Sequence, residues 1–429
     1  MPMKNKLLRD TAEQLHYILK WVLHGEVESL AEKTASAALV DLAIRNGVGS
    51  LVFQFFQNCD SAEISGTLEA RLLAYHASVL AQNSEYLSLA AKVEKHLREI
   101  SVPVYGIKGI ELIQAGLYAI GDRPLSDIDM LVPSRDVATG IMRELAKKLN
   151  DSSREHEFAD RFTRLSREDG AVLRGIRGNP VMLELHFPED PAFLPLPELI
   201  RMNANRLFAS YFSTPSEPRN PRLPTEFHLL LLGVHLTQHH LGAKLIWYFD
   251  IARLLQSSSQ KQALDWDLIV KQILFLDMAG VFRGLFQYLY THLEVGIPPE
   301  VEKALRRDAL LNRGMLAAMF QFSNTAGDCF CGAKIWAQKK ISLCMARRQV
   351  FYMLFSYLFS DHATFCYPDG KKKIYQSGQA AMVLITGKPF SGKWRYFAFL
   401  LGLPVSVIFV ALSFPIQVMY SLRRKWRQE

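Results

Sequence analysis

The stretch that decides the fold is YGIKGIELIQAGLYAIGDRPLSDIDMLVP, residues 105–133. It opens with a short β-rich run ending in glycine, continues into a short helical run, and closes on the alternating segment SDIDMLV. Successive side chains of a strand point to opposite faces of a sheet. The alternation therefore predicts that Asp127 and Asp129 project from one face, while Ile128 and Met130 enter the core.

Two carboxylates on one face repel each other unless a cation neutralises them. Mg²⁺ is a hard cation that uses oxygen ligands, often one or two carboxylates together with substrate phosphates. The Asp127–Asp129 pair thus indicates a metal site, with a charged turn as the alternative. In VMLELHF, residues 181–187, the same alternation puts Glu184 and His186 on one face. Glu184 is a candidate third carboxylate, and a half-exposed edge strand is the alternative for it.

Upstream of the aspartates, Lys108 and Gly109 end a predicted strand and lead into a helix. Glycine permits close approach of the backbone, and the free amides at a helix start suit phosphate. Lys108 and Arg123 would add positive charge for a triphosphate, and solvated surface cations are the alternative.

These residues, in this order, resemble a bacterial nucleotidyltransferase family whose fold is like that of DNA polymerase β. The resemblance covers residues 5–320 and rests on a Lys-Gly turn, the Arg-Pro-x-x-Asp-x-Asp block at 123–129, the Glu-x-His strand and a helical His/Asp region. The wider superfamily has Gly-Gly or Gly-Ser where this chain has Lys108-Gly109, which agrees with the narrower family.

The resemblance implies an α+β fold, with a polymerase β-like nucleotidyltransferase α/β module flanked by helical regions. It implies transfer of a nucleoside monophosphate from a nucleoside triphosphate such as ATP to a hydroxyl acceptor, with release of pyrophosphate. The acceptor class stays open between a protein, a small metabolite and a sugar-type molecule. A catalytically inactive, membrane-associated binding or scaffold protein of the same fold is the alternative function.

The same resemblance assigns roles to residues of this sequence. It implies that Mg²⁺, with Mn²⁺ as an alternative, is bound by the catalytic residues Asp127, Asp129 and Glu184, and that Glu184 also helps to deprotonate the acceptor. It implies that the nucleotide contacts Lys108, Gly109, Arg123 and Ser126.

A helical segment further along carries histidines and an aspartate. His235 and His239 are four residues apart, so they share a helix face and form a possible zinc pair, but a third ligand is missing from the pattern. The resemblance places this region beside the active site. We therefore expect acceptor-side or structural roles for four residues: His186, His235, His239 and Asp250.

The composition divides the chain into four predicted regions: an N-terminal helical region at 1–100, the catalytic module at 101–190, a helical region packing on the active site at 191–330, and a basic helical tail at 331–429. Residues 330–429 carry 15 Lys and Arg against 3 Asp and Glu, so the first 329 residues have 35 basic and 39 acidic side chains. This acidic balance argues against a groove for long nucleic acid.

Residues 396–422 form an apolar segment of 27 residues without a charge, followed by RRKWR. A bilayer-spanning helix needs about 20 apolar residues. Basic residues flank both ends, which fits a span or a hairpin on an anionic membrane surface, and a buried helix pair is the alternative. Together with five sparse cysteines, interpreted as reduced thiols, this predicts a cytoplasmic, membrane-associated protein.

Overall fold

The structure is a computed structural model that describes a defined part of the chain: residues 2–25, 34–59, 62–141, 169–174, 180–188, 209, 222–236, 244–261, 264–276, 278–307, 362–366 and 372–376. The chain forms two compact units, Met1–Asp308 and Ala309–Glu429. The first unit contains the stretch from residue 105 to 133.

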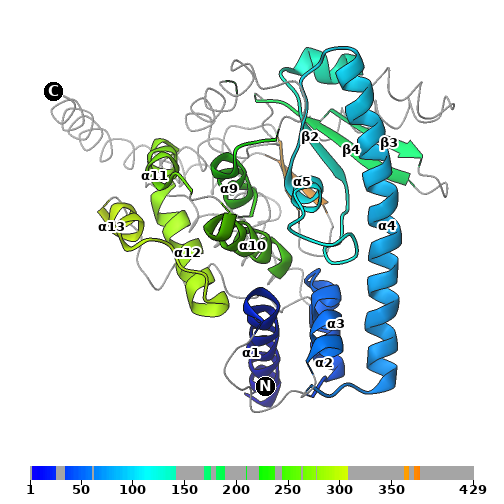
Figure 1. Ribbon diagram of the computed structural model, residues 1–429, viewed down its shortest axis with the longest axis vertical. Helices are drawn as coiled ribbons and strands as arrows, with labels where there is room; N and C mark the ends of the chain where they lie inside the picture. Colours follow the sequence, from blue (N-terminus) through cyan, green and yellow to red (C-terminus); the bar gives the residue numbers. More distant parts are fainter. Residues whose placement is uncertain are drawn as a thin grey trace, which may run out of the picture. The chain divides into compact units, whose positions relative to one another are not determined.

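Four helices open the first unit: α1 (Pro2–His24), α2 (Ala37–Arg45), α3 (Gly49–Asn58) and α4 (Gly66–Glu99). The Ser36 hydroxyl accepts a hydrogen bond from the Leu39 amide and so caps the start of α2. Between α2 and α3, Gly47 adopts a left-handed φ of 73°, which glycine reaches without a steric cost. The 34-residue α4 packs against α3 and is the longest helix drawn in Figure 1.

A four-stranded sheet follows, made of β1 (Tyr105–Gly106), β2 (Ile128–Leu131), β3 (Asp169–Arg174) and β4 (Pro180–His186), in the spatial order β1-β2-β4-β3. β2 runs parallel to β4, whereas the two outer pairings are antiparallel. The short helix α5 (Lys108–Gln114) packs against β2. Ile128 and Met130 are fully buried, as the alternation predicts.

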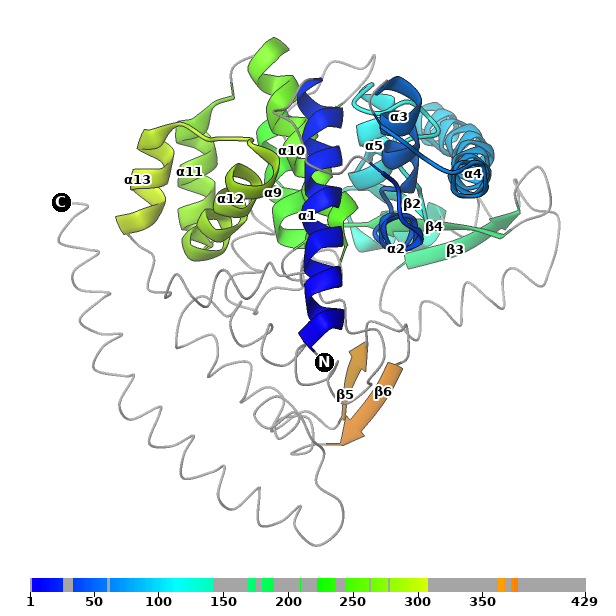
Figure 2. The ribbon, with the colours of Figure 1, turned by 90° about the horizontal axis from the view of Figure 1, so that it is seen from below.

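Among the described residues, five further helices follow in the first unit: α9 (Thr225–Val234), α10 (Leu245–Lys261), α11 (Trp266–Phe275), α12 (Ala279–Leu293) and α13 (Pro299–Arg307). α1 packs against α10 and α12 as well as against α2 and α3 (Figure 2). The His16 ring nitrogen Nε2 lies 2.8 Å from the Tyr288 hydroxyl in this α1–α12 contact. In the described part of the first unit, many helices accompany a small four-stranded sheet, which confirms the predicted α+β class.

In the second unit the described residues form a hairpin of β5 (His362–Cys366) and β6 (Lys372–Gln376). The prediction of a helical tail over 331–429 missed this hairpin, whose aromatic and β-branched residues favour strands. The apolar segment 396–422 lies outside the described residues. Over the described ranges, no helix has both the length and the apolar character that crossing a membrane requires.

Candidate active site

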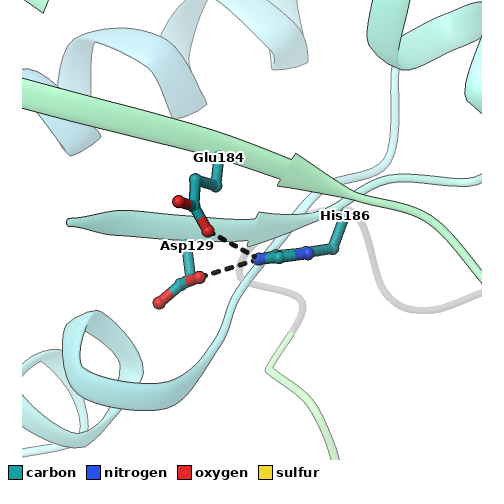
Figure 3. Close-up of side chains that lie close together, drawn as sticks. All are labelled: Asp129, Glu184 and His186. Carbon is teal, nitrogen blue, oxygen red and sulfur yellow. Dashed lines mark hydrogen bonds and ion pairs between the residues drawn. The ribbon is translucent and has the colours of Figure 1, made fainter. Parts of the chain in front are cut away.

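The sheet register brings two predicted acids together. Asp129 of β2 is the direct partner of Glu184 in β4, because the parallel strands pair Ile128 with Leu183 and Asp129 with Glu184. His186 lies two residues beyond Glu184, on the same face of β4. Figure 3 shows the three side chains of Asp129, Glu184 and His186 converging from the two strands.

His186 stands between the two carboxylates. Its Nε2 lies 2.8 Å from Oδ1 of Asp129 and 3.5 Å from Oε2 of Glu184 (Figure 3). One ligand atom from each of the three residues lies within 4.8 Å of the others, a spacing that suits a single metal ion. The side chains of Asp129 and His186 are buried, and that of Glu184 is half-buried. The sequence predicted an acceptor-side or structural role for His186, and the structure places its ring in the acidic cluster.

Lys108 also enters this cluster. Its Nζ donates to Asp129 Oδ1 over 2.6 Å and lies 3.4 Å from His186 Nε2. Burial by itself would lower the pKa of Lys108, but the charges of Asp129 and Asp127 outweigh it and hold this pKa above its ordinary value. Burial likewise opposes ionisation of Asp129, yet Lys108 and His186 hold the pKa of Asp129 below its ordinary range. Lys108 and Asp129 therefore form a charged, buried pair.

Asp127 stands directly before β2 and is half-buried. Burial, followed by the negative charges of Asp129 and Glu184, raises its pKa to about 7, although Lys108 and a hydrogen bond from Ser126 act in the opposite direction. Asp127 thus lies close enough to interact electrostatically with the carboxylates of Asp129 and Glu184. It is not part of the compact group of ligand atoms from Asp129, Glu184 and His186. The cluster holds more negative charge than Lys108 neutralises.

Arg123, expected at the triphosphate, is buried in an ion pair. Its Nε donates to Oδ1 of Asp250 in α10, and its Nη2 donates to Oδ2 of the same carboxylate, each over 2.8 Å. The Tyr118 hydroxyl donates to the same carboxylate over 2.9 Å. His228 of α9 is buried, and burial together with the charge of Arg123 lowers its pKa to about 3. The structure therefore joins Arg123 to Asp250, which the sequence had placed in separate groups.

Gly109 lies against the same arginine. A Cβ at this position would collide with Nη1 of Arg123 and with the Leu125 side chain. The close approach that the sequence attributed to phosphate is made by the protein's own guanidinium group.

The loop before Asp127 is held by polar residues of α4 that sequence reasoning missed. The Asn83 amide donates to the carbonyl of Arg123 over 2.7 Å and to that of Ile120, and its oxygen accepts from the Leu125 amide over 3.1 Å. Gln82 donates to the Leu125 carbonyl over 2.8 Å. Asn83 is fully buried within its helix and a buried amide requires partners, but this burial becomes visible only in the structure.

The remaining predicted residues are less informative. Ser126 is exposed, and its carbonyl accepts a hydrogen bond from Tyr86. His235 is buried directly after α9. His239 lies outside the described residues, so the possible zinc pair stays a prediction.

Comparison with known proteins gives one match. A family described as an uncharacterised nucleotidyltransferase matches residues 32–293, a range that includes α4, the sheet and helices α9 to α12. No curated protein and no solved structure matches the chain.

Proposed function

Because this chain belongs to the family of uncharacterised nucleotidyltransferases, we propose that it moves a nucleoside monophosphate from a nucleoside triphosphate to a hydroxyl acceptor. We propose further that the sheet and α5 are a catalytic module of the polymerase β type. The observation that carries the proposal is the parallel register of Asp129 with Glu184, with Asp127 just before β2. This register brings Asp129 and Glu184 together, and Asp127 lies near enough for both carboxylates to raise its pKa.

The acids fit a hard divalent cation. Carboxylate oxygens are the ligands that Mg²⁺ and Mn²⁺ take in nucleotide-processing sites, often with phosphate oxygens of the substrate. Asp127, Asp129 and Glu184 would hold the ion, and a ring nitrogen of His186 lies within 4.8 Å of ligand atoms of Asp129 and Glu184. When bound, such an ion stabilises charge on the attacking and leaving oxygens of an in-line displacement.

The protein's own residues would perform two tasks. Asp127, Asp129 and Glu184 would hold the cation, which would supply a binding point for the triphosphate of the nucleotide. Glu184 takes the proton of that hydroxyl as a general base. The bond from the acceptor oxygen to the α-phosphorus forms, the bond between the α-phosphorus and its bridging oxygen breaks, and pyrophosphate leaves. Positioning and charge neutralisation supply most of the acceleration in such transfers.

The rival function is a binding or scaffold protein without catalysis. The bond between Lys108 and Asp129 favours it, because an ammonium group already neutralises part of the charge that would attract a metal ion. The retention of all three acids favours the enzyme.

Label transfer separates the two functions. The purified chain is incubated with Mg²⁺, a cell extract and each nucleoside triphosphate, labelled either at the α- or at the γ-phosphate. We expect an acceptor to gain label from the α-position only. Label from the γ-position would indicate a kinase, and absence of α-label with all triphosphates would contradict the proposed function.

Two variants show whether these acids are responsible. Asp127→Asn with Asp129→Asn should abolish both label transfer and metal-dependent nucleotide binding in calorimetry. The matched control is Asp136→Asn, an exposed acid shortly after the same strand, which should retain both. Equal nucleotide binding by the double variant and the unaltered chain would exclude the acids from the site.

We also propose that the basic tail holds the enzyme at an anionic membrane surface on the cytoplasmic side. The support is the sequence of residues 396–422, 27 residues without a charge, followed by four basic residues within RRKWR. In vesicle flotation, the full chain should float with phosphatidylserine vesicles, and a chain lacking residues 390–429 should not. A full chain that stays at the bottom of the gradient would contradict membrane association.

A further inference from the structure

We propose that Lys108 is the resident counter-cation of the acidic cluster, so that the site binds one divalent cation where its three acids alone would favour two. The inference rests on the proposed function in one respect, because it takes Asp127, Asp129 and Glu184 as a cation site. It concerns what Lys108 does there.

The backbone places Lys108 for this task. Lys108 has a left-handed φ of 54°, which is strained for a residue with a side chain. The preceding Ile107 amide donates to the Asp129 carbonyl over 3.1 Å and fixes this turn against β2. Strained conformations of this kind persist where the surrounding structure enforces them, and they gather at functional sites. Here the turn directs a long basic side chain to the acids.

The two oxygens of the Asp129 carboxylate have different surroundings. Both side-chain partners that the structure describes for Asp129, Lys108 Nζ at 2.6 Å and His186 Nε2 at 2.8 Å, bind Oδ1. In Figure 3 the other oxygen of Asp129 points away from His186. The ammonium group therefore occupies one side of the carboxylate and leaves the other side for a metal ion.

The charges then balance for one ion. With all three acids ionised around a bound cation, the carboxylates carry three negative charges, and the Lys108 ammonium reduces the sum to two. A single Mg²⁺ or Mn²⁺ neutralises this remainder. Two-metal sites place two such ions about 3.5–4 Å apart between shared ligands. The ammonium group of Lys108 lies within hydrogen-bond distance of Asp129, and its positive charge replaces that of a second metal ion.

The same geometry bears on the expected role of Lys108 at the triphosphate. To reach a phosphate oxygen, the ammonium group would have to leave Asp129, and the acids would lose their internal cation. The counter-cation role predicts instead that removal of the Lys108 charge strengthens metal binding. A phosphate-binding role predicts unchanged metal binding and weaker nucleotide binding.

The test is Lys108→Met, which keeps the length of the side chain and removes its charge. Mn²⁺ alone is titrated into the full chain, with calorimetry for affinity and electron paramagnetic resonance for the number of ions bound. We expect one ion per chain in the unaltered protein. In Lys108→Met we expect affinity at least about tenfold higher, or a second bound ion, because a like charge has been removed from the site.

The matched control is Lys95→Met, which removes an exposed lysine of α4 that pairs with Glu99 at 4.0 Å. It should bind Mn²⁺ as the unaltered chain does. Unchanged or weaker Mn²⁺ binding in Lys108→Met would overturn the proposal. If Lys108→Met does not fold without metal, recovery of its helical circular dichroism by Mn²⁺, but not by KCl of equal ionic strength, supports the proposal, and failure of Mn²⁺ to restore it contradicts it.

These outcomes stay separate from those of the proposed function. Tighter Mn²⁺ binding by Lys108→Met, together with no label transfer by the unaltered chain, would refute the transferase and leave the counter-cation in place. Label transfer by the unaltered chain, together with unchanged Mn²⁺ binding by Lys108→Met, would refute the counter-cation alone.

Discussion

Arg123 and Asp250 form a bidentate ion pair in the interior of the first unit. The two N–H···O bonds are 2.8 Å each, and they join the loop before β2 to α10 across 127 residues of sequence. Arginine suits such a site because its planar guanidinium group matches both oxygens of a carboxylate. The pair ties the strand that carries Asp129 to the second group of helices.

Removal of one partner should cost much of the protein's stability. Asp250→Asn leaves the guanidinium group of Arg123 buried beside a neutral amide, and loss of one member of a buried pair costs about 3–5 kcal/mol. We expect urea unfolding to show this decrease in the free energy of unfolding. The control is Asp41→Asn, which breaks an ion pair with Arg71 in which both side chains are more than 40% exposed, and should cost less than about 1 kcal/mol. Equal losses in both variants would show that burial adds nothing to the Arg123–Asp250 pair.

Gly109→Ala should weaken the Arg123–Asp250 pair by displacing Arg123. The added methyl group would collide with Arg123 Nη1, and overpacking of this kind costs about 1–3 kcal/mol. Gly66→Ala is the control, because a Cβ there meets no atom within 4 Å, and its stability should change by less than about 1 kcal/mol.

A double-mutant cycle tests the cause of the Gly109 effect. If the methyl group acts through Arg123, the loss in Gly109→Ala with Asp250→Asn is smaller than the sum of the single losses. If the two losses in the free energy of unfolding are additive, the methyl group of Gly109→Ala does not act through the Arg123–Asp250 pair. A role for Gly109 at phosphate alone would leave the free energy of unfolding unchanged and weaken only nucleotide binding.

The sequence predicted the parts of this site that depend on local periodicity. Alternation along SDIDMLV and VMLELHF was sufficient to place Asp129 and Glu184 on strand faces, and the parallel register of β2 and β4 then brought them together. The alternation was not sufficient to predict the partners of Lys108 and Arg123. Whether a basic side chain faces a substrate phosphate or a carboxylate of the protein depends on tertiary packing. The hydrophobic periodicity and the composition of the sequence do not predict that packing. The partner of Arg123 is 127 residues away, and Asn83 serves a loop about 40 residues further along the chain.

Asn83 should act as a positioning residue for the acids. Asn83→Ala would leave the carbonyl of Arg123 and the amide of Leu125 without their side-chain partner in a buried loop, at about 1–3 kcal/mol for each unsatisfied group. Because this loop leads directly to Asp127, we also expect at least about tenfold weaker Mn²⁺ binding, since a 1.4 kcal/mol loss corresponds to a factor of ten.

The control for Asn83 is its neighbour Ser84→Ala. Ser84 is exposed and its hydroxyl donates to the Leu80 carbonyl of its own helix, so stability and Mn²⁺ binding should both be retained. If Asn83→Ala lowers stability but binds Mn²⁺ normally, Asn83 supports the fold without positioning the acids.

Glu111 should make stability depend on pH. Burial of its side chain in α5, with a smaller contribution from Glu94, raises its pKa from 4.5 to about 7, although Arg222 acts in the opposite direction from 3.9 Å. The folded protein therefore holds this proton more firmly than the unfolded chain does. The stabilisation is complete below pH 4.5 and is lost as pH rises to about 7. At about 1.4 kcal/mol per pH unit, the loss amounts to about 3 kcal/mol.

Glu111→Gln imitates the protonated form at every pH. We expect the variant to match the unaltered chain at pH 4.5 and to exceed its free energy of unfolding by about 3 kcal/mol at pH 8, in urea unfolding with EDTA present. Other groups titrate in both proteins, so the difference between the two proteins is the quantity to follow. Glu99→Gln, at the exposed end of α4, should show no such difference. A Glu111→Gln difference that is constant between pH 4.5 and 8 would mean that the pKa of Glu111 is the same in the folded protein and in the unfolded chain.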